Sequence, residues 1–258
     1  MLNEKTFIVR HPVLTALFFL FLISVFSAVP AILSGILKLS EIHTMSVYTS
    51  GFFLSALVAV LIMKKSCYPL TEYGLILKAD YSFGRLLGFI PLVLVTGVIF
   101  TAGIDTTFSV DLLVATFLYV LAASINEELY FRGLILRILR VKGTGFALIL
   151  SSLLFGLAHM GSLAAGKALD HTLLLILFSA LFAIVSTLLL IATGSIVVPI
   201  FWHFGHNIAS SITMETSPLV TLAIVGFQCI VLLGYALYLW KKVSLDKGNS
   251  LLSFSKEQ

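Results

Sequence analysis

The sequence predicts an all-α, polytopic membrane helix bundle with about eight transmembrane helices. Three observations lead to this prediction. Hydrophobic residues make up 59% of the 258 residues, charged residues make up 11%, and the mean hydropathy is +1.11. The apolar residues form continuous runs close to the roughly 20 residues that a helix needs to cross a bilayer, without the alternation of barrel strands. The Lys and Arg residues lie between these runs, as membrane topology requires.

Eight apolar segments account for this pattern. The first is too long for the apolar region of a signal peptide, so it is interpreted as an uncleaved span. The fifth is short, and the fourth is long and carries charged residues. The segments are expected at residues 13–37, 46–63, 86–104, 110–138, 145–160, 173–191, 195–212 and 218–240.

The basic residues predict the orientation of the chain. With eight crossings, both termini lie on one side, and that side receives 13 of the 16 Lys and Arg residues. Lys38 and Lys167 fall on the other side, and Arg132 lies within a span. The positive-inside rule therefore places both termini in the cytoplasm. The sequence pI of about 9.1 follows from this topology and does not indicate a nucleic-acid partner. Cys67 and Cys229 have no metal-ligand spacing.

Residues 1–258 are interpreted as a single transmembrane domain with three parts. The N-terminal part holds two spans and a cytoplasmic loop, the middle part holds the next five spans, and the last part holds one span and a cytoplasmic tail. These parts are residues 1–84, 85–212 and 213–258.

Three ionisable side chains lie deep in the fourth span. A charge at the centre of a bilayer costs at least about 2.5–3.5 kcal/mol on insertion scales, so Glu127, Glu128 and Arg132 must face protein or water. Glu128 and Arg132 are four residues apart and can pair along one helix face. Glu127 is rotated by about 100° from Glu128 and has no opposite charge at pairing distance on its own helix. Glu127 is therefore the candidate for chemistry, and a structural ion pair is the alternative for the other two.

Two more spans carry polar groups at a similar depth. The fifth ends with Phe155 and His159, and the seventh carries His203, His206 and Asn207. His203 and Asn207 are four residues apart and point toward one spot, whereas His206 lies on a neighbouring part of the same face. A single intramembrane histidine is usually a packing residue, but acids, histidines and an amide on three helices predict a functional site.

These groups would suit more than one activity. A carboxylate could act as a general base on water, while His and Asn donors stabilise an oxyanion, which is a set of groups for amide hydrolysis. Two histidines and a glutamate could instead bind zinc with an open position for water. A proton-coupled transporter using the Glu–His cluster is a rival class, although no inverted repeat is present. The other rival class is a membrane scaffold or immunity protein without catalysis.

Three motifs occur in the order of a known family. They are EExxxR at residues 127–132, FxxxH at 155–159 and HxxxN at 203–207. Together they resemble the motifs of the CAAX prenyl protease and bacteriocin-processing (CPBP, or Abi) family. The resemblance covers roughly residues 85–212, which makes this middle part the expected catalytic core. It implies an intramembrane endopeptidase of the glutamate type, often described as a metalloprotease.

The resemblance also implies roles for individual residues. Glu127 would be the base, His159 would orient the water, and His203 and Asn207 would form the oxyanion hole. Supporting residues would be Glu128, Arg132, Phe155 and His206, of which His206 is an addition to the family pattern. No cofactor is expected; if zinc or another divalent metal binds, its ligands would be Glu127, His159 and His203.

The expected substrate is a membrane-associated protein or peptide. Family members act on prenylated CAAX proteins in eukaryotes, and in bacteria many are linked to bacteriocin processing or self-immunity. The size and short termini of this chain are typical of the bacterial members, which predicts a location in a bacterial plasma membrane and argues against a prenylated substrate.

The depths of the site residues can also be predicted. At a rise of 1.5 Å per residue, Glu127 lies about 15 Å and His203 about 12 Å above the cytoplasmic boundary. The two side chains can therefore meet inside the bilayer. His159 would lie about 21 Å above the boundary and fits less well, unless its helix tilts.

Overall fold

The computed structural model describes residues 10–66, 68–75, 88–164 and 166–250. The predicted all-α class is confirmed, since the one extended pairing in these ranges is an isolated bridge between Ile104 and Thr213. Residues 86–87 of the predicted third span lie outside the described residues. The longer helices are α2 (Pro12–Leu37), α3 (Glu41–Lys65), α5 (Ile90–Gly97), α6 (Val110–Glu128), α8 (Thr144–Ala158), α10 (Leu169–Thr193), α11 (Val197–Ser211) and α12 (Pro218–Ser250). The short elements are η1 (Leu70–Tyr73), η2 (Val98–Ala102), η3 (Leu129–Ile135), α7 (Leu136–Leu139), η4 (Arg140–Lys142) and α9 (Gly161–Ala164).

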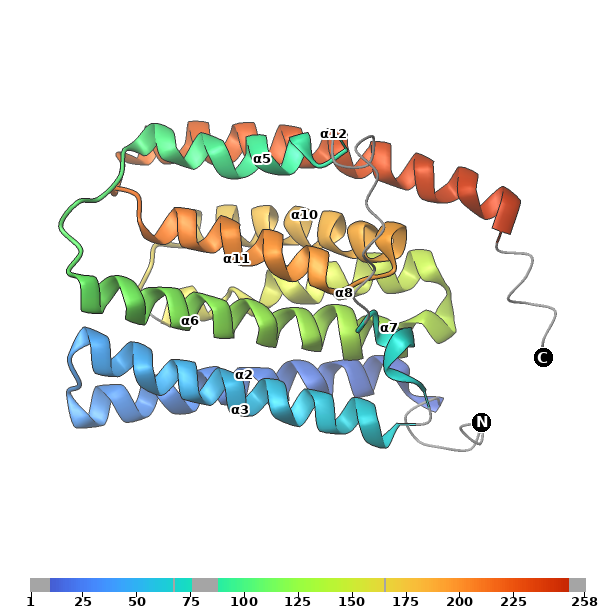
Figure 1. Ribbon diagram of the computed structural model, residues 1–258, viewed down its shortest axis with the longest axis horizontal. Helices are drawn as coiled ribbons and strands as arrows, with labels where there is room; N and C mark the ends of the chain where they lie inside the picture. The colour runs from blue at the N-terminus through green and yellow to red at the C-terminus, as the bar shows by residue number, and fades with distance from the viewer. Residues whose placement is uncertain (1–9, 67, 76–87, 165, 251–258) are drawn as a thin grey trace.

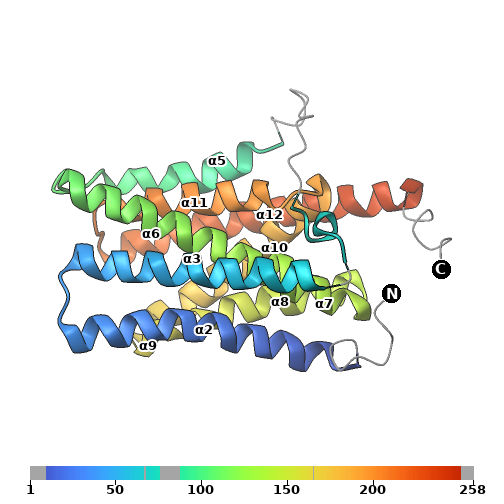
Figure 2. The same cartoon turned by 60° about the horizontal axis from the view of Figure 1, so that its bottom comes forward.

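Six helical segments of the described chain are long and apolar enough to cross a membrane. Ile90–Ala102 is a shorter apolar helical segment, and α11 is a further helix of 15 residues. Each segment that the sequence predicts overlaps one of these helical segments, although six of them are long enough to be candidate spans in the described chain. The helices run side by side, and α2 begins at the end of the bundle where α12 ends (Figures 1 and 2). This arrangement is that of an integral membrane protein.

The outer surface of the bundle is strongly apolar. Large hydrophobic side chains are exposed on α2, α6 and α12, including Phe21, Val110 and Ile230 at 65%, 77% and 74% exposure. A soluble protein rarely exposes a continuous apolar surface of this extent, because water penalises it. Hydrocarbon does not penalise an apolar surface, so these side chains are suited to contact with lipid.

The centre of the bundle is formed by α6 and the elements that continue it. The helix begins after Ser109, whose hydroxyl accepts a hydrogen bond from the Leu112 N–H at 3.2 Å. It packs against α3 on one side and α11 on the other, while α10 packs against both α8 and α12 (Figure 1). All seven residues of η3 are buried. The part of this span that carries Glu128 and Arg132 is therefore shielded from lipid.

Two close contacts fix neighbouring helices to each other. Gly133 of η3 lies against Met63 of α3, and a Cβ atom at Gly133 would come within 2.3 Å of the Met63 Cε atom. On the opposite side of the bundle, the buried Gln228 of α12 donates a hydrogen bond to the Val95 carbonyl of α5 at 2.8 Å. An amide in an apolar bundle needs such a partner, because an unsatisfied polar group there is costly.

Candidate active site

The candidate site begins where α6 changes into a π-helix. Glu127 and Glu128 are the last two residues of α6, and η3 follows as a π-helix of seven residues. Short π-helical segments inside α-helices are often found at functional sites. The two carboxylates have different surroundings: the Glu128 side chain is fully buried, whereas the Glu127 side chain is 28% exposed.

Glu128 holds two other site residues at once. Its Oε2 atom lies 3.1 Å from the Arg132 Nε atom, and its Oε1 atom accepts a hydrogen bond from the His203 Nδ1 atom at 2.8 Å. The predicted pair with Arg132 is therefore confirmed. The contact with His203 was not predicted, and it means that Glu128 orients a candidate catalytic ring as well as neutralising a buried charge.

Glu127 approaches the other edge of the same histidine ring. Its Oε2 atom lies 3.8 Å from the His203 Nε2 atom. The predicted meeting of Glu127 and His203 inside the bundle is thus confirmed. The imidazole of His203 lies between two carboxylates from consecutive positions of one helix, with each ring nitrogen facing a different one.

Phe155 brings the three motifs together. Its ring centroid lies 4.9 Å from that of Phe131, 5.1 Å from that of His159 and 5.9 Å from that of His203. The Arg132 guanidinium lies 4.5 Å from the Phe155 centroid, which is within the range of a cation–π contact. One aromatic ring from α8 thus contacts residues of η3 and α11, which explains why a phenylalanine belongs to the motif.

His159 follows the last residue of α8 and is half-buried. Its Nδ1 atom lies 2.9 Å from the Phe155 carbonyl oxygen. Because a carbonyl oxygen can only accept, Nδ1 carries the hydrogen, and in the neutral ring Nε2 is left as the acceptor. The ring contact with Phe155 places His159 beside the cluster, which the depth calculated for a straight helix made doubtful.

The two remaining candidates of α11 have different surroundings. His206 is buried, and its ring stacks on Phe178 of α10 with centroids 5.3 Å apart. His203 and not His206 therefore faces the acids, which answers a question that the sequence left open. Asn207 lies one turn after His203 and is half-buried.

Sequence reasoning did not identify Phe182. Its ring stacks on Trp202 with centroids 3.9 Å apart and also lies 5.1 Å from the His203 ring. Phe182 therefore supports His203 from the side of α10. Within an apolar span, nothing in the sequence distinguishes this phenylalanine from its neighbours.

In the described ranges, no group of three or more His, Cys, Asp and Glu residues is arranged to hold a metal ion. The alternative ligand set of Glu127, His159 and His203 is not assembled.

These observations define a polytopic membrane protein with a buried glutamate–histidine site. Comparison adds one finding: residues 109–209 match the family described as Type II CAAX prenyl endopeptidase Rce1-like. The matched region contains all three motifs and agrees with the family resemblance that these motifs carry. No curated protein and no solved structure matches the chain.

Proposed function

We propose that this protein is an intramembrane endopeptidase that hydrolyses membrane-associated proteins or peptides with a water activated by Glu127. One observation supports this proposal most directly. The partly exposed Glu127 carboxylate lies 3.8 Å from the Nε2 atom of His203, whose Nδ1 atom is held by Glu128. A base that is partly accessible and an oriented imidazole are then present in one place.

The charges in the site suggest a protonation state. Glu128 and Arg132 neutralise each other, and His203 donates from Nδ1 to Glu128. A neutral His203 would then turn an unprotonated Nε2 toward the Glu127 carboxylate, which is a repulsive arrangement. We infer that His203 carries a second proton and that Glu127 is ionised, so that the four groups together are neutral. The imidazolium is a charge-assisted hydrogen-bond donor.

In the first step, Glu127 removes a proton from a water molecule as the water oxygen forms a bond to the scissile carbonyl carbon. His159 orients this water through Nε2, which can accept its second hydrogen. The carbonyl becomes a tetrahedral oxyanion. The His203 imidazolium and the Asn207 amide donate to this oxygen, and the burial of His203 strengthens the donation from its ring.

In the second step, the oxyanion collapses and the C–N bond breaks. Glu127 returns its proton to the leaving amine, so that the carboxylate is regenerated and no covalent intermediate forms. Glu128 and Arg132 touch no substrate in this scheme. They keep His203 in position, and Phe155 and Phe182 support its ring from either side.

We propose that this chemistry needs no metal ion. The nearest substrate class is a peptide whose cleavage site lies in or at the membrane, with CAAX-like C-terminal peptides and bacteriocin precursors as the two candidates. We also retain a bacterial plasma membrane and cytoplasmic termini as proposals, based on the distribution of basic residues.

The test is a cleavage assay with purified protein and a peptide library that contains prenylated and unprenylated CAAX sequences. Cleavage that is lost in Glu127→Gln and survives thorough chelation is the expected result. Loss of activity on chelation, with recovery on adding zinc, would contradict the metal-free mechanism. Proton-coupled uptake would indicate a transporter, and binding without cleavage would indicate a scaffold or immunity protein.

A further inference from the structure

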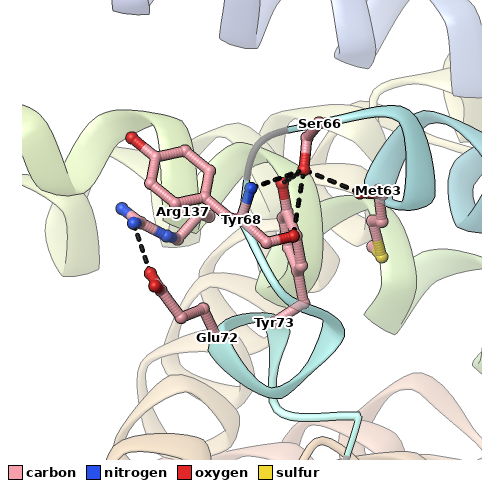
Figure 3. Close-up of polar contacts among 6 residues, drawn as sticks. All are labelled: Met63, Ser66, Tyr68, Glu72, Tyr73 and Arg137. Atoms are coloured by element: carbon pink, nitrogen blue, oxygen red, sulfur yellow. Dashed lines mark hydrogen bonds and ion pairs between the residues drawn. The ribbon is translucent and has the colours of Figure 1, made fainter. Parts of the chain in front are cut away.

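A short segment after α3 contacts the helices that carry both halves of the site. This segment, residues 68–75, is called the clamp segment and contains η1. Glu72 forms an ion pair with Arg137 of α7, and the Arg137 guanidinium lies 3.7 Å from the centroid of the Tyr68 ring (Figure 3). The clamp segment thus holds the continuation of the helix that presents Glu127 and Glu128.

At Gly74, two residues after Glu72, the clamp segment contacts the start of α11, the helix that carries His203. The Gly74 carbonyl accepts a hydrogen bond from the Ile196 N–H at 2.8 Å, and Ile196 is the N-cap residue of α11. Gly74 has a φ of 76°, and a Cβ atom there would lie 2.5 Å from Leu190 Cδ1 and 3.0 Å from the Ile196 nitrogen. A glycine is required both for this backbone conformation and for this approach.

The clamp segment is also braced against the end of α3 and within itself. The buried Tyr73 donates from its hydroxyl to the Ser66 Oγ atom at 2.7 Å (Figure 3). The Leu75 N–H donates to the Leu70 carbonyl at 3.2 Å, which closes the turn around η1. A turn held in this way transmits a displacement at one contact to the other.

We propose that the clamp segment positions the site by setting the separation between Glu127 and His203, an inference that rests on the proposed function. Arg137 lies ten residues after Glu127, and Ile196 lies seven residues before His203. Both anchors are therefore about two to three helical turns from the reacting groups. Glu72, Arg137 and Gly74 are positioning residues in this scheme, because they touch neither substrate nor water in the site.

The ion pair makes this positioning sensitive to salt. The Glu72 side chain is 45% exposed and the Arg137 side chain 17%, so mobile ions can screen their attraction. A contact inside the bilayer, such as that of Glu128 with Arg132, is far less affected. The two ion pairs therefore predict different responses to ionic strength.

The test compares four variants with wild type in peptide cleavage: Glu72→Gln, Arg137→Gln, the exchange Glu72→Arg/Arg137→Glu, and Gly74→Ala. Lys142→Gln is the matched control, because it removes an exposed charge from the same end of the bundle. Each Gln variant should lower kcat about three- to fivefold with little change in KM. The exchange should restore at least about half of kcat, and Gly74→Ala should lower it about tenfold or more.

Ionic strength adds a readout that a general folding defect does not mimic. The ratio of wild-type to Glu72→Gln kcat should approach one near 1 M salt, where the Debye length falls to about 3 Å. A ratio that stays constant with salt would contradict the proposal, as would an exchange variant no better than its parents.

A distance measurement separates this proposal from the proposed function. Spin labels at Val141 and Val198, in a background in which Cys67 and Cys229 are replaced by Ser, report the spacing of η4 and α11. Glu72→Gln and Gly74→Ala should broaden the distance distribution, and Lys142→Gln should not. If wild type cleaves no peptide but the distribution broadens, the proposed function fails and the clamp stands. If both variants keep the wild-type distribution and kcat, the clamp is overturned.

Discussion

Two spans of this protein, α2 and the α6–η3–α7 segment, differ in how many charged side chains they carry and in how deeply they are buried. The 26 residues of α2 include no Asp, Glu, Lys or Arg, and its outward side chains are large and apolar. The α6–η3–α7 segment carries Glu127, Glu128, Arg132 and Arg137, and its middle is fully buried. The difference shows that charge is tolerated within a span where neighbouring helices supply partners, as they do at the candidate site.

The largest effect is expected at the partly exposed acid. Glu127→Gln should lower kcat by about 10²–10⁴-fold, because the amide cannot take a proton from water. Expression and thermal stability in detergent should remain at the wild-type level, since the Glu127 side chain is 28% exposed and is not part of the Arg132 pair. Wild-type turnover in this variant would show that Glu127 is not the base.

Glu128 should behave differently, since it is buried and has two partners. Glu128→Ala leaves the Arg132 charge unpaired in an apolar core and should destabilise the protein by about 3–5 kcal/mol. Activity should also fall, because His203 loses its Nδ1 partner. Thermal denaturation and cleavage assays measure the two effects.

The double variant Glu128→Leu/Arg132→Met separates those effects. It removes both charges and should recover most of the stability, since buried ion pairs can often be replaced by apolar residues. It should not recover activity, because His203 remains unoriented. Recovery of both would mean that Glu128 acts on stability alone.

A smaller effect is expected where α3 meets η3. Gly133→Ala would place a Cβ atom 2.3 Å from the Met63 Cε atom and should cost about 1–3 kcal/mol through overpacking. Because that atom is the end of a flexible side chain, Met63→Val in the same protein should relieve most of the loss. Thermal melts of the two single variants and the double variant form the cycle, and purely additive effects would rule out this contact as the cause.

The smallest effect is expected on the outer surface. Phe21→Ala on α2 removes a side chain that is 65% exposed and should change stability by less than about 0.5 kcal/mol. Its activity should be that of wild type. A loss comparable to that of Gly133→Ala would mean that this surface of α2 packs against another protein instead of lipid.

Much of this protein could be predicted from local sequence. The eight apolar segments are recognisable because a membrane requires long hydrophobic runs and the helix satisfies its own backbone. The Glu128–Arg132 pair is likewise local, since residues four apart on a helix face each other. The approach of Glu127 to His203 was also predictable. The bilayer thickness allows the depth of each residue to be calculated along its helix, and these two residues have similar calculated depths.

The orientation of side chains around each helix was decided by tertiary packing alone. Depth cannot tell which histidine of α11 faces the acids; the contacts of His203 with Glu128 and of His206 with Phe178 decide it. The same holds for Phe182 and for the Glu72–Arg137 pair, whose partners lie far apart in sequence. Hydropathy specifies how deep a residue lies in the membrane. The rotation of a helix about its axis is instead set by how its side chains pack against those of the neighbouring helices. This packing depends on many residues that are far apart in sequence, so no local pattern specifies it.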